Sequence, residues 1–144
     1  TDFVAPLVPL GLMFGRFGNF INGELYGRVA DIETITWAII FPQSGTLDPR
    51  HPSQIYQAFG EGLILFIILY NLQKLKLPIG SLSASFLIGY GLFRFVIEFF
   101  REPDSYLGFV FTNLTMGQIL CLPMVIFGVF LLSLSFRNKL LQSR

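Results

Sequence analysis

The chain has 144 residues, of which 53% are hydrophobic and only 13% are charged, roughly half the charged share of an average soluble domain. A mean hydropathy of +0.63 indicates that lipid surrounds much of the surface, because a soluble fold of this size cannot bury so much apolar area. The net charge of +1 argues against a nucleic-acid-binding protein, which needs a basic field.

The first predicted element is an apolar segment over residues 3–15. It reaches only about 20 Å as a helix, short of the ~30 Å hydrocarbon core of a bilayer. Pro6 and Pro9 would distort a helix that contained them in its interior. We therefore expect the end of an earlier membrane span, or a proline-distorted helix, that brings the next motif to the membrane edge.

Residues 15–27 read GRFGNFINGELYG, a stretch with four glycines, one cation and one anion. If residues 16–22 are helical, Arg16, Asn19 and Asn22 share one face at three-residue spacing. The guanidinium fork of an arginine suits a phosphate, because it donates two parallel hydrogen bonds. Taken alone, the motif is equally compatible with a capped helix end and a glycine-rich turn.

Residues 28–54 are polar enough to form a small extracytoplasmic head. Apolar and polar residues alternate over residues 35–41, which predicts one β-strand. Residues 42–45 read PQSG, which indicates a turn. Residues 48–52 contain two prolines, and residues that precede proline avoid the helical region, so we expect an extended loop there.

The rest of the chain predicts three complete transmembrane helices, at about 55–72, 82–100 and 118–136, with a second outer loop over residues 101–117. The fold class is therefore an all-α polytopic membrane protein with a short strand in its head, and we expect residues 1–144 to form a single membrane domain. Basic residues follow the first and third spans, and the positive-inside rule places them in the cytoplasm with the C-terminus; they are Lys74, Lys76, Arg137, Lys139 and Arg144.

The second predicted span carries Arg94 near its centre, where an arginine costs about 2.5–3.5 kcal/mol on insertion scales. Tyr90, Arg94 and Glu98 recur at four-residue spacing, so they stack along one helix face. Two interpretations stay open, an internal Arg94–Glu98 ion pair that joins helices and a functional site. Glu61, between two glycines of the preceding span, is most simply a buried acid paired with an arginine across the bundle.

His51 is the only histidine and the one group here whose ordinary pKa suits proton transfer near neutrality. Taken alone, a loop histidine beside proline is commonly a surface or capping residue. Cys121 is the only cysteine, so it forms no internal disulfide, and its apolar surroundings indicate a small buried hydrophobe. The scattered acids make no ligand set, and we expect neither a metal nor a cofactor.

The GRFGNFINGELYG motif resembles the signature of the bacterial prolipoprotein diacylglyceryl transferases, membrane enzymes that start lipoprotein maturation. The later HPSQIY of residues 51–56 and GYGLFR of residues 89–94, followed by Glu98, resemble the same family in the same order and at similar spacing. The resemblance covers nearly the whole chain. It implies the carboxyl-terminal part of a longer enzyme, whose amino-terminal half holds a histidine-containing motif and the presumed general base.

The resemblance also implies an activity in the bacterial inner membrane. Such an enzyme transfers the diacylglyceryl group of phosphatidylglycerol to the lipobox cysteine of a prolipoprotein signal peptide, forming a thioether and releasing glycerol phosphate. We expect Arg16 and Arg94 to straddle the phosphate, with Tyr90 donating a hydrogen bond near the reaction. The expected substrate-binding and orienting residues are Arg16, Asn19, Asn22, Glu24, Gly27, His51, Glu61 and Glu98.

Two other classes of function remain open. An anionic-phospholipid-binding or transport subunit would move an intact lipid without chemistry, whereas a transferase yields a lipidated peptide and glycerol phosphate. A purely structural membrane scaffold would bury the Arg16 face against protein.

Overall fold

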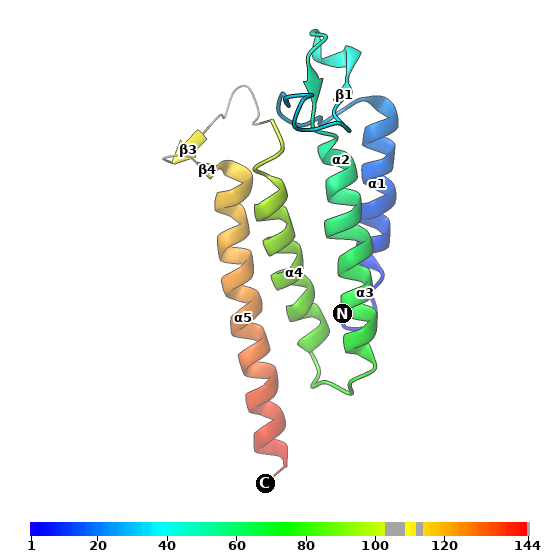
Figure 1. The fold of residues 1–144 in the computed structure, drawn as a ribbon. Coiled ribbons are helices and arrows are strands. Elements are labelled where there is room, and N and C mark those ends of the chain that lie inside the picture. Colours follow the sequence, from blue (N-terminus) through cyan, green and yellow to red (C-terminus); the bar gives the residue numbers. More distant parts are fainter. Residues whose placement is uncertain (103–108, 112–113, 144) are drawn as a thin grey trace.

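The computed structural model describes residues 1–102, 109–111 and 114–143 and is mostly helical. Helix α1 (Val8–Asn22) packs along a second, continuous helix that consists of α2 (Ser53–Gln57), the π-helical η2 (Ala58–Ile64) and α3 (Leu65–Gln73). Helix α4 (Ser81–Ile97) lies between α3 and α5 (Met116–Gln142), and a small head sits above α1 and α2 (Figure 1). The predicted helical class is thus confirmed.

Helix α1 begins and ends at residues suited to those positions. Pro9 occupies its first turn, where the missing N–H costs no hydrogen bond. Gly23 ends it with a positive φ of 68°, and its N–H donates to the Phe20 carbonyl at 3.0 Å. The prediction of a helix over residues 16–22 is therefore confirmed. The segment before it is different from the prediction, because residues 2–7 form turns and the helix begins only at Val8.

The predicted strand over residues 35–41 is wrong except at its end. Strand β1 covers only Ile39–Ile40 and pairs antiparallel with β2 (Pro49–Arg50). Residues 32–34 form turns instead, because the Asp31 side chain accepts a hydrogen bond from the Glu33 N–H at 3.0 Å and such local bonds compete with a strand. The predicted turn at residues 42–45 is confirmed by η1 (Pro42–Ser44), which Gly45 ends at φ 77°.

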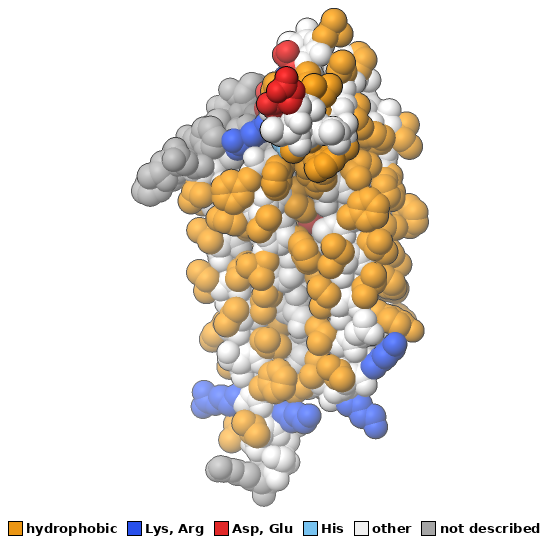
Figure 2. Space-filling view, viewed as in Figure 1, with side chains coloured by type: hydrophobic (Ala, Val, Ile, Leu, Met, Phe, Trp, Pro, Cys, Tyr) orange, Lys and Arg blue, Asp and Glu red, His pale blue; other side chains and the backbone are white. Residues whose placement is uncertain are grey.

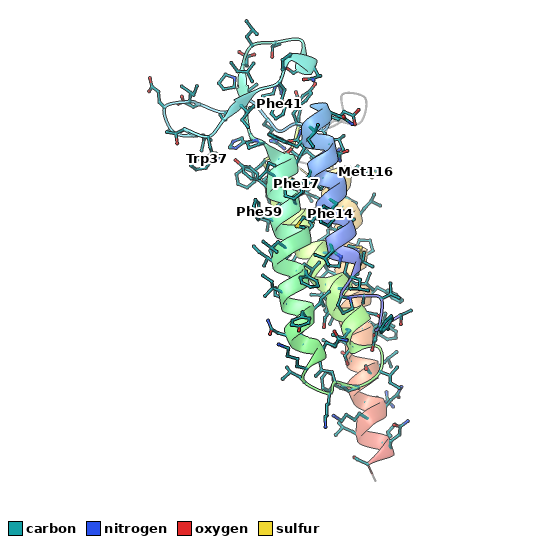
Figure 3. The ribbon with its side chains drawn as sticks, turned by 90° about the vertical axis from the view of Figure 1, so that its right-hand side faces the viewer. Phe14, Phe17, Trp37, Phe41, Phe59 and Met116 are labelled. Atoms are coloured by element: carbon teal, nitrogen blue, oxygen red, sulfur yellow. The ribbon has the colours of Figure 1, made fainter. Side chains whose placement is uncertain are left out.

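Phe41 fixes the head onto the end of α1. Its ring packs edge-on against Phe20 at 6.1 Å between centroids and stacks on Tyr26 at 5.9 Å. Phe41 is buried while Trp37 is exposed, and Figure 3 shows Phe41 above α1 with Trp37 on the outer arm of the head. The head is therefore held by aromatic packing on the signature rather than by a large sheet.

Two helices, Ser53–Gln73 and Met116–Gln142, are long and apolar enough to cross a membrane. Helix α4 has 17 residues, about 26 Å, and ends at Ile97, so it is shorter than the predicted span over residues 82–100. Hydrophobic side chains line the length of the bundle, while Lys and Arg gather at the end that carries the C-terminus (Figure 2). Of the expected basic tail, Arg144 lies outside the described residues.

The predicted outer loop over residues 101–117 lies partly outside the described residues, at positions 103–108 and 112–113. What is described contains β3 (Phe109–Phe111) paired antiparallel with β4 (Leu114–Thr115). A capping box formed by Thr115 and Gln118 then begins α5, because each side chain satisfies a free backbone N–H of the other. Helix α5 therefore begins at Met116, two residues before the predicted span.

Small residues let α4 and α5 approach closely. A Cβ on Gly91 would lie 2.6 Å from a methyl group of Val125, and a Cβ on Gly128 would lie 3.1 Å from the Ala84 carbonyl oxygen. Glycine at helix contacts is a common device in membrane proteins. This packing holds α4 in place along α5 and so positions Arg94.

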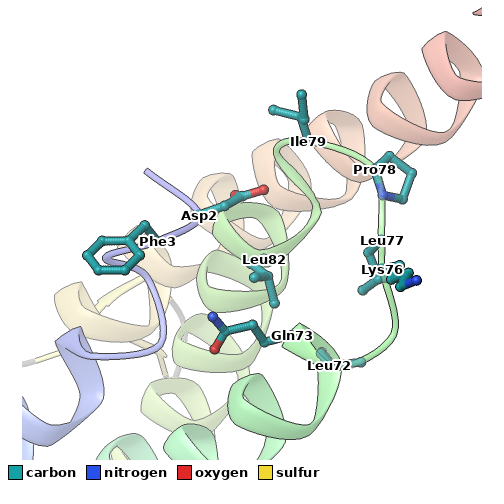
Figure 4. Close-up of a pocket in the computed structure, with 9 residues that line it drawn as sticks. All are labelled: Asp2, Phe3, Leu72, Gln73, Lys76, Leu77, Pro78, Ile79 and Leu82. Atoms are coloured by element: carbon teal, nitrogen blue, oxygen red, sulfur yellow. The ribbon is translucent and has the colours of Figure 1, made fainter.

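At the end of the bundle away from the head, the N-terminal segment caps α4. The Asp2 carboxylate accepts hydrogen bonds from the Gly80 N–H at 2.6 Å, the Ser83 N–H at 3.0 Å and the Ser83 hydroxyl at 2.7 Å. Figure 4 shows Asp2 beside the α3–α4 connection, at a pocket of about 300 Å³ that Leu82 and Ile79 also line. An aspartate at a helix N-terminus is stabilising, so this contact ties residues 1–7 to α4.

Candidate functional site

The three sequence motifs meet at the head end of the bundle. The Gly27 N–H donates to the His51 carbonyl oxygen at 2.9 Å, and the Arg28 N–H donates to the Phe100 carbonyl oxygen at 2.9 Å. The Arg28 Nε also donates to the Arg101 carbonyl oxygen at 2.9 Å. The signature, the head loop and the end of α4 are therefore joined through their backbones.

Glu61 lies inside the bundle, in the π-helical segment η2. Its side chain is fully buried. The glycines on either side allow this, because a Cβ on Gly60 would lie 2.8 Å from Ile97 of α4 and a Cβ on Gly62 would lie 2.5 Å from Met13 of α1. Both neighbouring helices therefore close around the carboxylate, and π-helical segments of this kind often accompany functional sites.

Arg94 extends from α4 toward two carboxylates. Its Nη1 lies 3.8 Å from Glu61 Oε1, and its Nη2 lies 3.5 Å from Glu98 Oε2. Arg101 lies 3.6 Å from the same Glu98 oxygen, and the Thr115 hydroxyl donates to the other at 3.2 Å. The internal ion pair is thus present, but these separations exceed the 2.7–2.9 Å of a tight charge-assisted hydrogen bond. The guanidinium keeps capacity for another acceptor.

Arg16 reaches the same cluster from α1. The ionisable groups of Glu61, Arg94, Tyr90 and Arg101 lie near enough to interact electrostatically with its guanidinium, which is half-buried. The structure therefore brings together five of the predicted site residues from three helices, namely Arg16, Glu61, Tyr90, Arg94 and Glu98.

The rest of the predicted residues surround this cluster or lie beyond it. Asn19 is half-buried on α1, whereas Asn22 and Glu24 are exposed at its end. The Glu24 backbone oxygen, not its carboxylate, accepts a hydrogen bond from Gln54 Nε2 at 2.6 Å. Gly27 serves the backbone junction described above. Asn19 is therefore less exposed than Asn22 and Glu24, and the binding roles expected of these three residues stay predictions.

His51 belongs to an aromatic group beside the junction. Its Nδ1 lies 3.0 Å from the Tyr56 hydroxyl, which accepts a hydrogen bond from Trp37 Nε1 at 2.7 Å. The ring also packs edge-on against Phe100 at 5.3 Å between centroids. Burial lowers the pKa of His51 below its ordinary value, so the imidazole is neutral at pH 7 and can accept a hydrogen bond from Tyr56.

Two buried glutamines were not among the predicted site residues. Gln54 and Gln57 are fully buried and belong to the helix that carries Glu61. Gln57 lies three residues after Gln54 and four residues before Glu61, so all three share one face. The sequence signal that could have identified them is the helical spacing of two amide side chains with an acid in an apolar segment. Among the residues that the structure describes, no group of three His, Cys, Asp or Glu is placed to hold a metal ion.

The sequence of this chain is similar to those of known membrane enzymes. Residues 1–134 match the family described as prolipoprotein diacylglyceryl transferase. Phosphatidylglycerol–prolipoprotein diacylglyceryl transferases that match include those of Paracidovorax citrulli, 54% identical over 91% of this chain and 48% of the relative, and Cupriavidus pinatubonensis, 53% identical over 96% and 49%. That of Pseudoalteromonas translucida is 56% identical over 95% and 50%.

The chain spans about half the length of these curated relatives. The matched residues include the signature, the head loop and the α4 motif, and backbone hydrogen bonds join the first two to the segment that follows α4. On these grounds, the chain belongs to the prolipoprotein diacylglyceryl transferase family of membrane proteins.

Proposed function

We propose that the chain is the phosphate-binding part of an enzyme that transfers the diacylglyceryl group of phosphatidylglycerol to the lipobox cysteine of a prolipoprotein. The observation that carries the proposal is the buried charged cluster between apolar helices. Three arginines, Arg16, Arg94 and Arg101, face two carboxylates, Glu61 and Glu98. Guanidinium groups of this kind bind a phosphodiester through paired, charge-assisted hydrogen bonds.

The proposed reaction needs positively charged hydrogen-bond donors beside the phosphate. The thiolate sulfur of the cysteine attacks the glyceryl carbon that bears the phosphodiester, and a carbon–sulfur bond forms as the carbon–oxygen bond breaks. The electron pair of the broken bond stays on glycerol phosphate, which leaves with one more negative charge. Fixed donors aimed at a departing phosphate stabilise this transition state most effectively in a water-poor site.

The residues divide the work by position. Arg16 and Arg94 bind the phosphate from two helices, and Tyr90 donates a hydrogen bond near the reacting carbon. Glu61 and Glu98 hold the arginines in place. Asn19, Asn22, Glu24, Gly27 and His51 are assigned to the outer part of the site, where they shape the loop and meet the lipid head group or the peptide.

The placement in the membrane belongs to the same proposal. Residues 1–144 form one membrane domain with three spans, α4 being the shortest, and residues 28–54 form its outer head. The basic end of the bundle in Figure 2 faces the cytoplasm, as the positive-inside rule requires. The site then opens toward the outer face, where prolipoproteins present their lipobox cysteine.

The experiment replaces Arg94 by alanine in the full-length protein and measures thioether formation on a lipobox peptide with phosphatidylglycerol. We expect the turnover rate to fall by about 10²-fold or more, the usual cost of losing one oxyanion donor. Arg137→Ala at the basic end of α5 is the matched control and should keep the rate. Full activity of a well-folded Arg94→Ala protein would contradict the proposal.

A further inference from the structure

Gln57 carries a buried amide that the mechanism above does not use. Its side chain is fully buried, and neither Oε1 nor Nε2 has a hydrogen-bond partner among the described residues. Gln54, one turn earlier, is also fully buried, and its Nε2 donates to the Glu24 carbonyl while its Oε1 stays unpaired. Unpaired polar atoms at such depth are rare in native proteins, and each calls for an explanation.

The unpaired groups of Gln54, Gln57 and Glu61 are neighbours along one helix face rather than scattered through the fold. Gln57 lies four residues before Glu61. Within the described part of the chain, neither carboxylate oxygen of Glu61 has a hydrogen-bond partner, and neither does Arg94 Nη1. Helix α2 and segment η2 pack against both α1 and α4. The amide of Gln57 therefore lies about one turn from Glu61 toward the head, on the helix whose Glu61 faces Arg94.

The unpaired donors and acceptors indicate which kind of ligand would satisfy them. The two amide oxygens and Glu61 need donors, whereas Gln57 Nε2 and Arg94 need acceptors. A phosphate supplies acceptors only, and an ammonium group supplies donors only. Hydroxyl groups supply both, so a small polyol next to a phosphate brings the donors and the acceptors that the Gln57 amide needs.

We propose that Gln57 is the residue that selects lipids with a hydroxyl-bearing head group, by exchanging hydrogen bonds with the glycerol attached to the phosphate. The inference rests on the proposed function and adds to it a lipid selectivity. Gln57 accepts from one of the two free hydroxyls and donates to the oxygen of the other, whose own hydrogen goes to Glu61. Phosphatidic acid, which has the phosphate without this glycerol, leaves Gln57 unpaired.

The test compares the wild-type full-length protein with Gln57→Leu in nanodiscs. Binding of phosphatidylglycerol and of phosphatidic acid is measured for each, together with thioether formation. We expect Gln57→Leu to lower the preference for phosphatidylglycerol over phosphatidic acid at least about tenfold, the loss of roughly one good hydrogen bond to a buried partner. Gln73→Leu, an exposed glutamine on the same continuous helix, is the matched control and should keep the preference.

A second measurement separates selectivity from a structural role. Because the Gln57 amide has no hydrogen-bond partner among the residues that the structure describes, its replacement by leucine should leave the melting temperature of the lipid-free protein unchanged or raise it. A lowered melting temperature with an unchanged lipid preference would overturn the inference. If the wild-type protein forms the thioether and Gln57→Leu keeps the wild-type lipid preference, the inference on Gln57 fails while the transferase proposal stands. If the wild-type protein forms no thioether, the transferase proposal fails, and the measured lipid preference still decides whether Gln57 selects the head group.

Discussion

Gly27 is the residue at which the signature, the head and the end of α4 come together. A Cβ at this position would lie 2.5 Å from the Phe100 carbonyl oxygen and would overlap the His51 carbonyl as well. Both obstacles are backbone atoms, so neither can rotate away as a long side chain would. The site of this protein therefore depends on the absence of a side chain as much as on the arginines it brings together.

Replacing Gly27 by alanine should destabilise the fold by about 1–3 kcal/mol, the usual range for overpacking a tight contact. The measurement is the melting temperature of the full-length protein in detergent. Gly18→Ala, in the same signature but with open space around its Cα, should instead be neutral or slightly stabilising, because alanine favours a helix interior. If the melting temperature of Gly27→Ala were as high as that of Gly18→Ala and of wild type, the junction would tolerate a side chain, contrary to this prediction.

At the scale of elements, the capping of α4 by Asp2 gives a second prediction. Burial alone raises the pKa of this carboxyl, but its hydrogen bonds from Ser83 and Gly80 outweigh that effect and leave the pKa lowered. A lowered folded-state pKa means that the cap stabilises the protein above the ordinary pKa of about 3.9. This stabilisation is lost as pH falls through the folded-state value.

Asp2→Asn should therefore lower the free energy of unfolding by about 1 kcal/mol at pH 7, because the amide keeps only one of the two acceptor oxygens and loses the negative charge that a helix N-terminus favours. The difference from wild type should shrink as the pH is lowered below about 4. Chemical unfolding followed by circular dichroism checks both points. Asp48→Asn, an exposed aspartate in the head, serves as the control, and a pH-independent difference for Asp2→Asn would speak against the cap.

The elements differ in how far the sequence could predict them. The helix over residues 16–22 and the position of Arg94 follow from spacing and from the cost of a charge among apolar residues. The strand over residues 35–41 failed because Asp31 forms a local turn that periodicity does not register. The π-helical turn around Glu61 and the burial of Gln57 depend on how α1 and α4 pack against η2, which no local pattern reveals.

At the scale of the whole molecule, two arginines far apart in sequence meet between three helices. Arg16 comes from α1 and Arg94 from α4, and Glu61 stands between them on η2. The head and the backbone junction at Gly27 hold the three helices at this end, while the close α4–α5 contact supports Arg94 from behind. We propose that both arginines bind one lipid phosphate.

A double-mutant cycle on phosphatidylglycerol binding tests that claim most directly. The dissociation constant is measured for the wild-type full-length protein, for Arg16→Ala, for Arg94→Ala and for the double variant, all in nanodiscs of neutral lipid. If both guanidinium groups bind the same phosphate, each single substitution weakens binding and the two losses are non-additive by at least about 0.5 kcal/mol. Losses that add within about 0.3 kcal/mol, or a variant that binds as tightly as wild type, would contradict the account.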